Sequence, residues 1–418
     1  MTEHIQNKIS AVLVVLMALT LLTTTAGTNL TVLGLILVAP FAWLKFNPHE
    51  SIDHDIAIFL SLVVSICIWD LTTNFISGHS LRMSLSALMH DMRTLGFVVV
   101  LWAIFSNAKI ARIALITLIF IVVSLALINL LLTLTGALQQ GQYFWSSAPH
   151  MYGQVLVGLF FVLGQMWLVR PSLSWRVAIP MLVLLLSLFI ASERRTGYLL
   201  LVAGMVVWCM LNRKRIFIGK HKWWVLFGLL GSLVVAVNSP IFQSRMLLVV
   251  QEVNQFISMT TEQRAGVYTS VGIRMQFYIS IVELIKQSNW WVGIGSIDFA
   301  SAFYAINQQM GTTPEQAAST FSNFQNPHNE YLFMLATKGV IGLALYMAIF
   351  GQACRVAWKK VDEVQRISLV MFVFLFMLSI TTNSMMTDME EGHFTMLVLL
   401  IFLAPKNLAL SGREPETL

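Results

Sequence analysis

The sequence predicts an all-α integral membrane protein, and three observations carry this prediction. Of the 418 residues, 57% are hydrophobic and only 11% are charged, well below the roughly 25% charged residues of soluble domains. The apolar residues gather in long runs, and a helix of about 20 such residues crosses the hydrocarbon core of a bilayer. The basic residues lie in the short segments between these runs, as they do in multi-pass membrane proteins.

About twelve transmembrane helices are expected. The fourth is the most polar, because Arg82, His90, Asp91 and Arg93 crowd its start. In chain order, the apolar runs are Lys8–Thr25, Asn29–Phe46, His54–Asn74, Ser84–Ser106, Ile110–Thr135, Tyr152–Val169, Trp175–Ser192, Gly197–Leu211, Trp223–Val237, Asn329–Trp358, Gln365–Thr382 and His393–Leu408.

Both termini are predicted to be cytoplasmic. Most of the 26 Lys and Arg residues fall on one set of alternate connections, and the positive-inside rule places that set in the cytoplasm. The long loop before the tenth span then faces outward, which in a bacterium is the periplasm, and the protein is expected in the cell inner membrane. This orientation accounts for the net charge of +6, so we predict no nucleic-acid partner.

The cysteines and the N-terminus add little chemistry. Cys67, Cys209 and Cys354 all lie inside apolar runs, so neither a disulfide framework nor a cysteine metal site is predicted. The first apolar run follows a single lysine, Lys8, and a second run follows at once. We therefore expect an uncleaved first span rather than a cleaved signal peptide.

These predictions divide the chain into three parts. Residues 1–237 hold the first nine spans, residues 238–327 form a periplasmic helical loop, and residues 328–418 hold the last three spans and a cytoplasmic tail. Within the loop, Ile241–Ile257 and Val271–Ile285 carry apolar residues at helical spacing, which predicts amphipathic helices lying on the membrane. The pair Trp290 and Trp291 favours the membrane interface, and a polar stretch leads up to His328.

His328 is the main candidate for acid–base chemistry. Asn326 is a favoured N-cap and Pro327 a favoured first helical residue, so we expect a helix to start at Pro327 with His328 in its first turn. The positive end of the helix dipole favours a neutral imidazole, and the free N–H groups attract an anion. His328 is therefore either a base for chemistry on an anionic substrate or only part of a helix cap.

Arginines on the outer side are candidate phosphate ligands. Arg194 and Arg195 lie in a tight external turn, and Arg274 opens the second loop helix. A guanidinium is permanently charged, and its planar fork matches phosphate oxygens. The alternatives are headgroup anchoring or pairing with Glu193 for the first two residues, and a solvated helix face for Arg274.

The turn before the last span is acidic, with Asp388, Glu390, Glu391 and His393. It lacks the spacing of a known metal motif, so we expect no metal there. We interpret it as a solvated turn, or as a place from which Asp388 or Glu390 orients an arginine of the site. The sequence shows no nucleotide-binding, nucleophile-elbow or zinc motif, so no cofactor is expected. One histidine and a few arginines at a membrane surface suit transfer of a group from a phosphate-activated lipid to an alcohol.

Three local motifs follow one another on the predicted outer side of the membrane. They are Arg195-Thr196-Gly197, then Arg274 followed by Gly293-Ile294-Gly295, then Pro327-His328-Asn329-Glu330-Tyr331 with Lys338-Gly339 and Gly342. In this order they resemble the O-antigen ligase family, which is related to O-antigen polymerases and bacterial protein O-oligosaccharyltransferases. The resemblance also covers the whole hydropathy plan.

The resemblance implies a metal-independent, inverting glycosyltransferase of the GT-C type. It would move a glycan from undecaprenyl diphosphate to lipid A–core oligosaccharide during lipopolysaccharide synthesis. His328 would be the general base, and Arg195 and Arg274 would bind the diphosphate, with Arg194 as a further candidate. Asn329, Tyr331 and Asp388 are candidates for supporting roles.

Two alternatives stay open. One is an O-antigen polymerase or a protein O-oligosaccharyltransferase that uses the same donor. The other is a lipid or solute transporter, which usually has ionisable residues or broken helices inside its spans. We expect the charged residues of this chain at the ends of its spans, which favours the enzyme.

Overall fold

The computed structural model describes residues 3–21, 23–45, 53–139, 142–143, 152–170, 174–191, 195–218, 240–260, 264, 269–310, 327–359, 362–383 and 389–403. All regular structure in these residues is helical, which confirms the all-α class. The helices are α1 (Glu3–Thr20), α2 (Thr25–Lys45), α4 (His54–Ile76), α5 (Leu81–Thr94), α6 (Phe97–Phe105), α7 (Ala108–Leu134), α8 (Tyr152–Val169), α9 (Ser174–Leu186) with a π-helical turn (Ser187–Ala191), α10 (Arg195–Leu211), α11 (Arg213–Ile218), α13 (Pro240–Ser258), α15 (Ser270–Gln287), α16 (Phe299–Gln309), α18 (Glu330–Trp358), α19 (Glu363–Ser379) and α20 (Met389–Leu403).

In the described part of the chain, six helices are long and apolar enough to cross a membrane. The chain is therefore a multi-pass membrane protein. These helices cover Thr25–Leu44, His54–Ile76, Leu81–Phe105, Ala108–Leu134, Tyr152–Val169 and Glu330–Trp358. Helices also overlap the other predicted spans, except that Trp223–Val237 lies outside the described residues. The total of twelve spans and the GT-C type remain predictions.

The fourth predicted span runs through two helical segments that follow each other directly. They are α5, whose sequence is polar, and α6, which is wholly apolar, and Leu95 and Gly96 between them keep helical backbone angles. The polar residues that crowd the start of this span therefore lie on its first segment, and only α6 is buried along most of its length.

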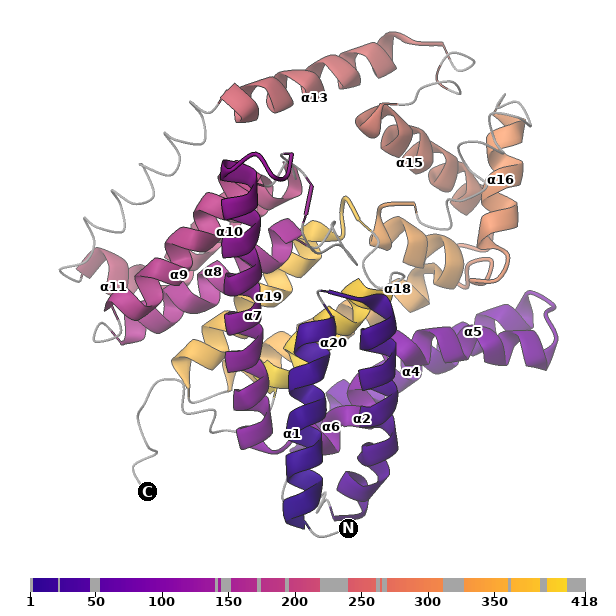
Figure 1. Cartoon of the computed structure of the whole chain (residues 1–418). Coiled ribbons are helices and arrows are strands. Elements are labelled where there is room, and N and C mark those ends of the chain that lie inside the picture. The colour runs from indigo at the N-terminus through magenta and orange to yellow at the C-terminus, as the bar shows by residue number, and fades with distance from the viewer. Residues whose placement is uncertain are drawn as a thin grey trace.

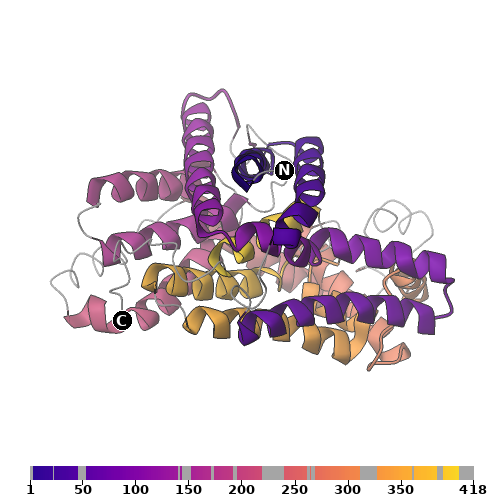
Figure 2. The same ribbon diagram turned by 90° about the horizontal axis from the view of Figure 1, so that it is seen from below.

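Helix α18 packs against α4 and α19. Helix α8 lies against α9, α10 and α19. The N-terminal helix α1 packs between α2 and α7, and these three stand on one face of the remaining helices (Figures 1 and 2). The segments that carry the candidate site residues thus belong to the other helices.

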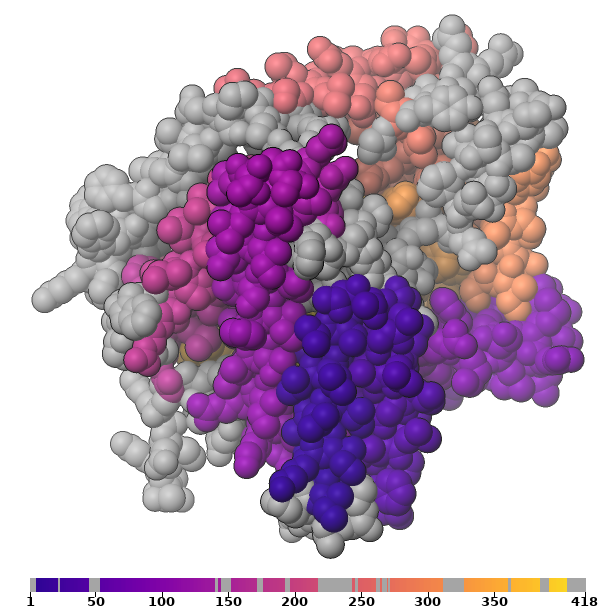
Figure 3. Space-filling model, in the orientation of Figure 1, coloured from indigo at the N-terminus to yellow at the C-terminus, as the bar shows by residue number. Residues whose placement is uncertain are grey.

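The outer faces of α1 and α2 are strongly apolar, and Figure 3 shows this side of the molecule with the two helices in indigo. Large apolar side chains on them are exposed, among them Val12, Leu30, Leu37 and Leu44. Soluble monomers rarely expose such continuous apolar surface, and in a bilayer the lipid chains cover it.

Ion pairs join the helices at one end of the bundle. Lys359 and Arg355, near the end of α18, form ion pairs with Asp55 at the start of α4. Arg215 of α11 pairs there with Glu363 at the start of α19. These are basic residues of the predicted cytoplasmic side, so the start of α18 lies at the opposite end, as the predicted topology requires.

The predicted loop contains helices α13, α15 and α16. Helices α13 and α15 form over the two expected segments, Ile241–Ile257 and Val271–Ile285, and the expectation that they lie on the membrane stays a prediction. Helices α15 and α16 lie together beside the start of α18 (Figure 1), where Phe277, Phe303 and Phe333 form a separate small apolar core.

Candidate functional site

The start of α18 is fixed by Asn329. Its side-chain oxygen accepts the N–H of Leu332 at 3.0 Å, and its side-chain amide donates to the carbonyl of Thr381 at 3.1 Å. The N–H of Glu330 also donates to the carbonyl of Ile380 at 3.0 Å. The prediction that the helix starts at Pro327 with His328 in its first turn was therefore wrong. Asn329 is the cap, its side chain also binds the segment that follows α19, and His328 precedes it.

His328 has an unusual backbone conformation and a defined neighbour. Its φ is 55°, in the left-handed region that few residues other than glycine adopt. Such residues cluster at functional sites. The half-buried imidazole lies parallel to the ring of Phe277, with ring centroids 6.3 Å apart and planes at 9°. Its carbonyl accepts the hydroxyl of Tyr278 at 3.2 Å. Helix α15 thus holds both the ring and the backbone of His328.

Arg274 lies one turn before Tyr278 on the same helix and is half-buried. Burial raises the pKa of the Tyr278 hydroxyl, and the positive charge of Arg274 opposes this rise. The phenol therefore stays protonated and donates to the carbonyls of His328 and Thr381. The structure thus brings Arg274 and His328, far apart in the sequence, into one region.

Arg195 is the first residue of α10. Its side chain, and the whole of Arg194, lie outside the described residues. The start of α10 can still be located: a Cβ added to Gly197 would lie 3.2 Å from the Cα of Gly153 at the start of α8. The next residue, Gln154, is hydrogen-bonded to Ser379, close to Thr381. Helix α10 therefore begins at the same end of the bundle as His328.

The three residues expected to support the site, Asn329, Tyr331 and Asp388, differ in what the structure shows of them. Asn329 caps α18, as described above. The hydroxyl of Tyr331 donates to the carbonyl of Met377 at 2.8 Å, which joins α18 to α19. Asp388 lies outside the described residues.

Glu391 and His393 are buried at the start of α20, so the expectation of a solvated turn was wrong for them. Over the described residues, no group of three or more His, Cys, Asp or Glu could hold a metal ion.

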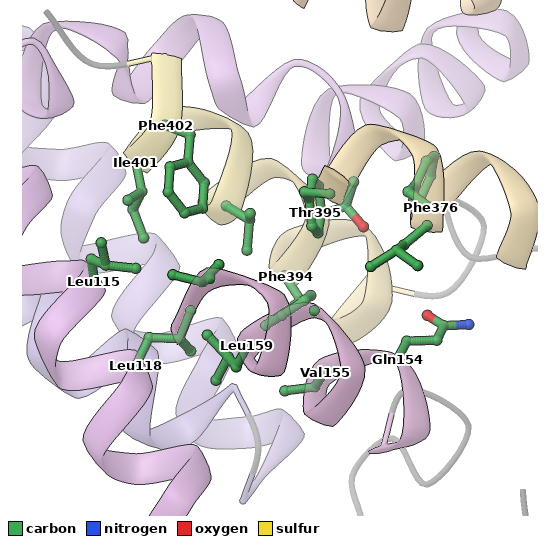
Figure 4. Close-up of a pocket in the computed structure, with 15 residues that line it drawn as sticks. Leu115, Leu118, Gln154, Val155, Leu159, Phe376, Phe394, Thr395, Ile401 and Phe402 are labelled. Carbon is green, nitrogen blue, oxygen red and sulfur yellow. The ribbon is translucent and has the colours of Figure 1, made fainter. Parts of the chain in front are cut away.

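An apolar pocket runs between α7, α8, α19 and α20 (Figure 4). Its lining includes Leu118, Leu159, Phe376 and Phe394, and Gln154 stands at one edge with its amide turned away from the apolar side chains. Because Gln154 bonds to Ser379, this edge of the pocket adjoins the end of the bundle that carries His328.

A buried ionic cluster lies deeper in the bundle. The ammonium of Lys338 on α18 lies 2.8 Å from a carboxylate oxygen of Asp70 on α4, and it also pairs with Asp91 on α5. Lys338 is 2% exposed and Asp70 0%. Helix α18 is also broken at the next residue, Gly339, with φ 66° and ψ −170°. The expectation that charged residues stay at the ends of spans was therefore wrong. The sequence signal was Lys338-Gly339 inside an apolar run.

Comparison with known proteins supports the resemblance seen in the sequence. Residues 180–347 match the family described as O-Antigen ligase. The matched segment contains Arg195, Arg274 and His328, and it also contains Lys338 and Gly339. No curated protein matches the chain. The match supports an enzyme of the ligase or polymerase kind that acts on lipid-linked glycans at a membrane.

Proposed function

We propose that this chain is an O-antigen ligase, and the proposal starts from the match of residues 180–347 to the O-antigen ligase family. It moves a glycan from undecaprenyl diphosphate to lipid A–core oligosaccharide at the periplasmic face of the inner membrane. It is a metal-independent, inverting glycosyltransferase of the GT-C type. The observation that carries the proposal is the family match, because the matched segment includes all three residues that the sequence assigns to the reaction.

In this proposal His328 is the general base. The imidazole accepts the proton of the acceptor hydroxyl as the hydroxyl oxygen bonds to the anomeric carbon of the glycan. The parallel ring of Phe277 and the Tyr278 hydrogen bond hold His328 in place from α15. A base must be held within hydrogen-bond reach of the proton that it removes, and this support suits that task.

Arg274 and Arg195 are the proposed ligands of the diphosphate. The bond between the anomeric carbon and the diphosphate oxygen breaks, and the diphosphate leaves with the electron pair. Fixed guanidinium groups stabilise the charge that grows on it. A single displacement, with the base and the leaving group on opposite sides of the anomeric carbon, inverts that carbon and needs no carboxylate nucleophile.

The apolar pocket between α7, α8, α19 and α20 suits a short segment of the polyprenyl chain in this scheme, because the pocket is much smaller than the whole chain. Its lining is almost entirely aliphatic and aromatic, and its Gln154 edge adjoins the end of the bundle with His328. The diphosphate would then lie at the polar edge and the isoprenoid units among the apolar side chains.

The test is reconstitution of the purified protein in lipid vesicles with lipid-linked glycan and lipid A–core in the presence of a chelator. The proposal expects glycan attached to lipid A–core, with inversion at the linking carbon. A ladder of repeats on the carrier lipid would instead indicate a polymerase, and glycan on an added acceptor protein would indicate a protein transferase. No covalent product at all would contradict the proposal.

One observation favours a second candidate, a transporter. Buried charges and a broken helix are features of transporter spans, and Lys338 with Gly339 supplies both. A transporter, however, leaves the freed backbone groups of the break to line a cavity. Here those groups are bound by other parts of the chain, as described below. Glycolipid flux across vesicles without a chemical product would favour the transporter.

A further inference from the structure

The break in α18 is filled by the loop segment that follows α15. In an uninterrupted helix the carbonyls of Ala336 and Thr337 would accept N–H groups four residues later. At the break they accept those of Ile294 at 3.0 Å and Gly295 at 2.9 Å instead. The loop therefore replaces hydrogen bonds that the helix gives up.

The donors freed by the break are bound in the same way. The N–H of Val340 donates to the carbonyl of Trp290 at 2.9 Å, and that of Ile341 donates to the carbonyl of Trp291 at 3.4 Å. Unpaired backbone groups in a membrane interior cost several kcal/mol each. The loop and the broken helix consequently stabilise each other, and neither conformation is expected without the other. We call residues 290–297 together with residues 336–341 the clasp.

Two glycines permit the close approach of the clasp. Gly293 has φ 80° and Gly339 has φ 66°, both in the region that favours glycine. A Cβ on Gly293 would lie 2.5 Å from the carbonyl atoms of Thr337, and a Cβ on Gly339 would collide with the carbonyl of Trp291. The two backbones touch at points where no side chain fits.

The clasp is fastened to α4 as well. The indole N–H of Trp69 donates to the carbonyl of Lys338 at 2.8 Å. The hydroxyl of Ser77 donates to the carbonyl of Ile294 at 2.9 Å, and that of Ser296 donates to a carboxylate oxygen of Asp70 at 3.2 Å. Asp70 is also a partner of Lys338. One buried carboxylate thus binds the loop and the broken helix together.

A buried ionic network is costly to desolvate and is weak evidence for stability, but such networks can specify one arrangement over others. Here Lys338 is the residue immediately before the break, and its partners come from α4 and α5. These contacts fix the point on α18 at which the loop can insert. That point lies about 12 Å along the helix from its first turn, at 1.5 Å per residue.

Helix α15 runs between this clasp and His328. Its C-terminal end leads directly into the turn that starts at Asn289, whose carbonyl accepts the N–H of Gly293 at 2.7 Å. Its middle carries Phe277 and Tyr278, which contact His328, and Arg274 lies one turn earlier. Two sets of contacts on α15 therefore set the position of Arg274 relative to His328. One is the clasp, which follows the C-terminal end of the helix, and the other is made by Phe277 and Tyr278 in its middle.

We infer that the clasp, fastened by Lys338 and Asp70, is a positioning device that holds Arg274 at a fixed place relative to His328. The inference rests on the proposed function, in which these two residues serve the diphosphate and the acceptor. The residues of the clasp touch neither substrate. They act through α15 and through the first turns of α18.

The test combines hydrogen exchange with kinetics on the full-length protein in nanodiscs. Gly339→Ala should raise amide exchange at residues 290–297 and 336–341, and it should lower turnover by about 10²-fold, the cost of a misplacement of about 1 Å. Gly351→Ala is the matched control, because Gly351 lies on the same helix and a Cβ there meets nothing within 4 Å. Gly136→Ala controls for backbone strain, because Gly136 has φ 73° but open space around it.

A milder variant covers the case in which Gly339→Ala does not fold. Ser77→Ala removes one hydrogen bond of the clasp and should raise exchange at residues 290–297 with a smaller loss of turnover. The loss should disappear when Ser77→Ala is combined with Arg274→Lys, because residues that act through one another are not additive. A merely structural role would give additive losses.

The outcomes separate the two proposals. Raised exchange with unchanged turnover, or additive losses in the Arg274→Lys background, would overturn the positioning inference and leave the proposed function intact. Unchanged exchange in both Gly339→Ala and Ser77→Ala would overturn the clasp itself. A reconstituted protein that forms no glycosylated product in its wild-type form would instead overturn the proposed function.

Discussion

The hydroxyl of Tyr278 donates a hydrogen bond to the backbone carbonyl of His328 at 3.2 Å, and it also reaches the carbonyl of Thr381 at 3.1 Å. One phenol thus joins the middle of α15, the residue before α18 and the segment after α19. Burial raises its pKa, so it remains a donor throughout the physiological pH range. The candidate site is therefore assembled by a residue that sequence analysis did not single out.

Tyr278→Phe tests this junction. The variant keeps the ring and loses both hydrogen bonds, so we expect a loss of about 1 kcal/mol in stability and a fall in turnover. Tyr304→Phe on α16 is the matched control, since its hydroxyl bonds to none of the described residues. Thermal unfolding in detergent and initial rates in vesicles measure the two effects. Equal behaviour of the two variants would count against the junction.

Arg274→Ala tests the proposed diphosphate ligand. Removing one group that stabilises transition-state charge typically costs about 10²–10³-fold in turnover, and we expect a loss of that size, with partial recovery in Arg274→Lys. Lys286→Ala, at the exposed end of the same helix, removes a cation whose partner is Glu283 and should leave turnover nearly unchanged. Steady-state kinetics with varied donor provide the measurement. If both alanine variants lose activity alike, α15 matters but Arg274 has no special role.

Gly158→Phe tests the proposed place of the polyprenyl chain. Gly158 lines the apolar pocket, and a Cβ there meets nothing within 4 Å, so a phenyl group can enter the open space. We expect the KM for the polyprenyl donor to rise by about tenfold, the equivalent of about 1.4 kcal/mol, with little change in the KM for the acceptor. Gly351→Phe is the control in size, because Gly351 is exposed. A donor KM that stays at the wild-type value would exclude this pocket as the binding place.

Lys338→Met tests the buried ionic cluster through stability alone. It leaves Asp70 and Asp91 facing each other without a cation, and breaking a buried pair costs about 3–5 kcal/mol. The exposed pair of Lys286 with Glu283 offers the comparison Lys286→Met, for which we expect less than about 1 kcal/mol. Chemical unfolding of the two variants gives the difference. Similar midpoints would show that the cluster contributes no more than a surface pair.

Much of the fold could be predicted from composition and periodicity. The run Tyr152–Val169 became α8 with the same bounds, and the loop helix expected at Val271–Ile285 became α15. These elements depend on local patterns, namely apolar run length and helical spacing. Such patterns persist whatever the rest of the chain does.

The remaining features depend on partners distant in the sequence. The sequence offers both Asn326 and Asn329 as caps, and in the structure Asn329 caps α18 while its side-chain amide donates to the distant carbonyl of Thr381. The break at Gly339 requires the loop at Trp290 to supply hydrogen bonds, and no local sequence pattern predicts this pairing of loop and helix. Lys338 is tolerated within an apolar run only because α4 and α5 bring carboxylates to it.

The most direct test of the account is turnover of His328→Ala, measured in lipid vesicles with lipid-linked glycan, lipid A–core and a chelator. Loss of a general base costs about 10²–10⁴-fold, and we predict a fall of that size in a protein that remains folded and still binds donor. The control is His54→Ala, because His54 is exposed at the start of α4, at the opposite end of the bundle. Wild-type turnover in His328→Ala would contradict the assignment of His328 as the base.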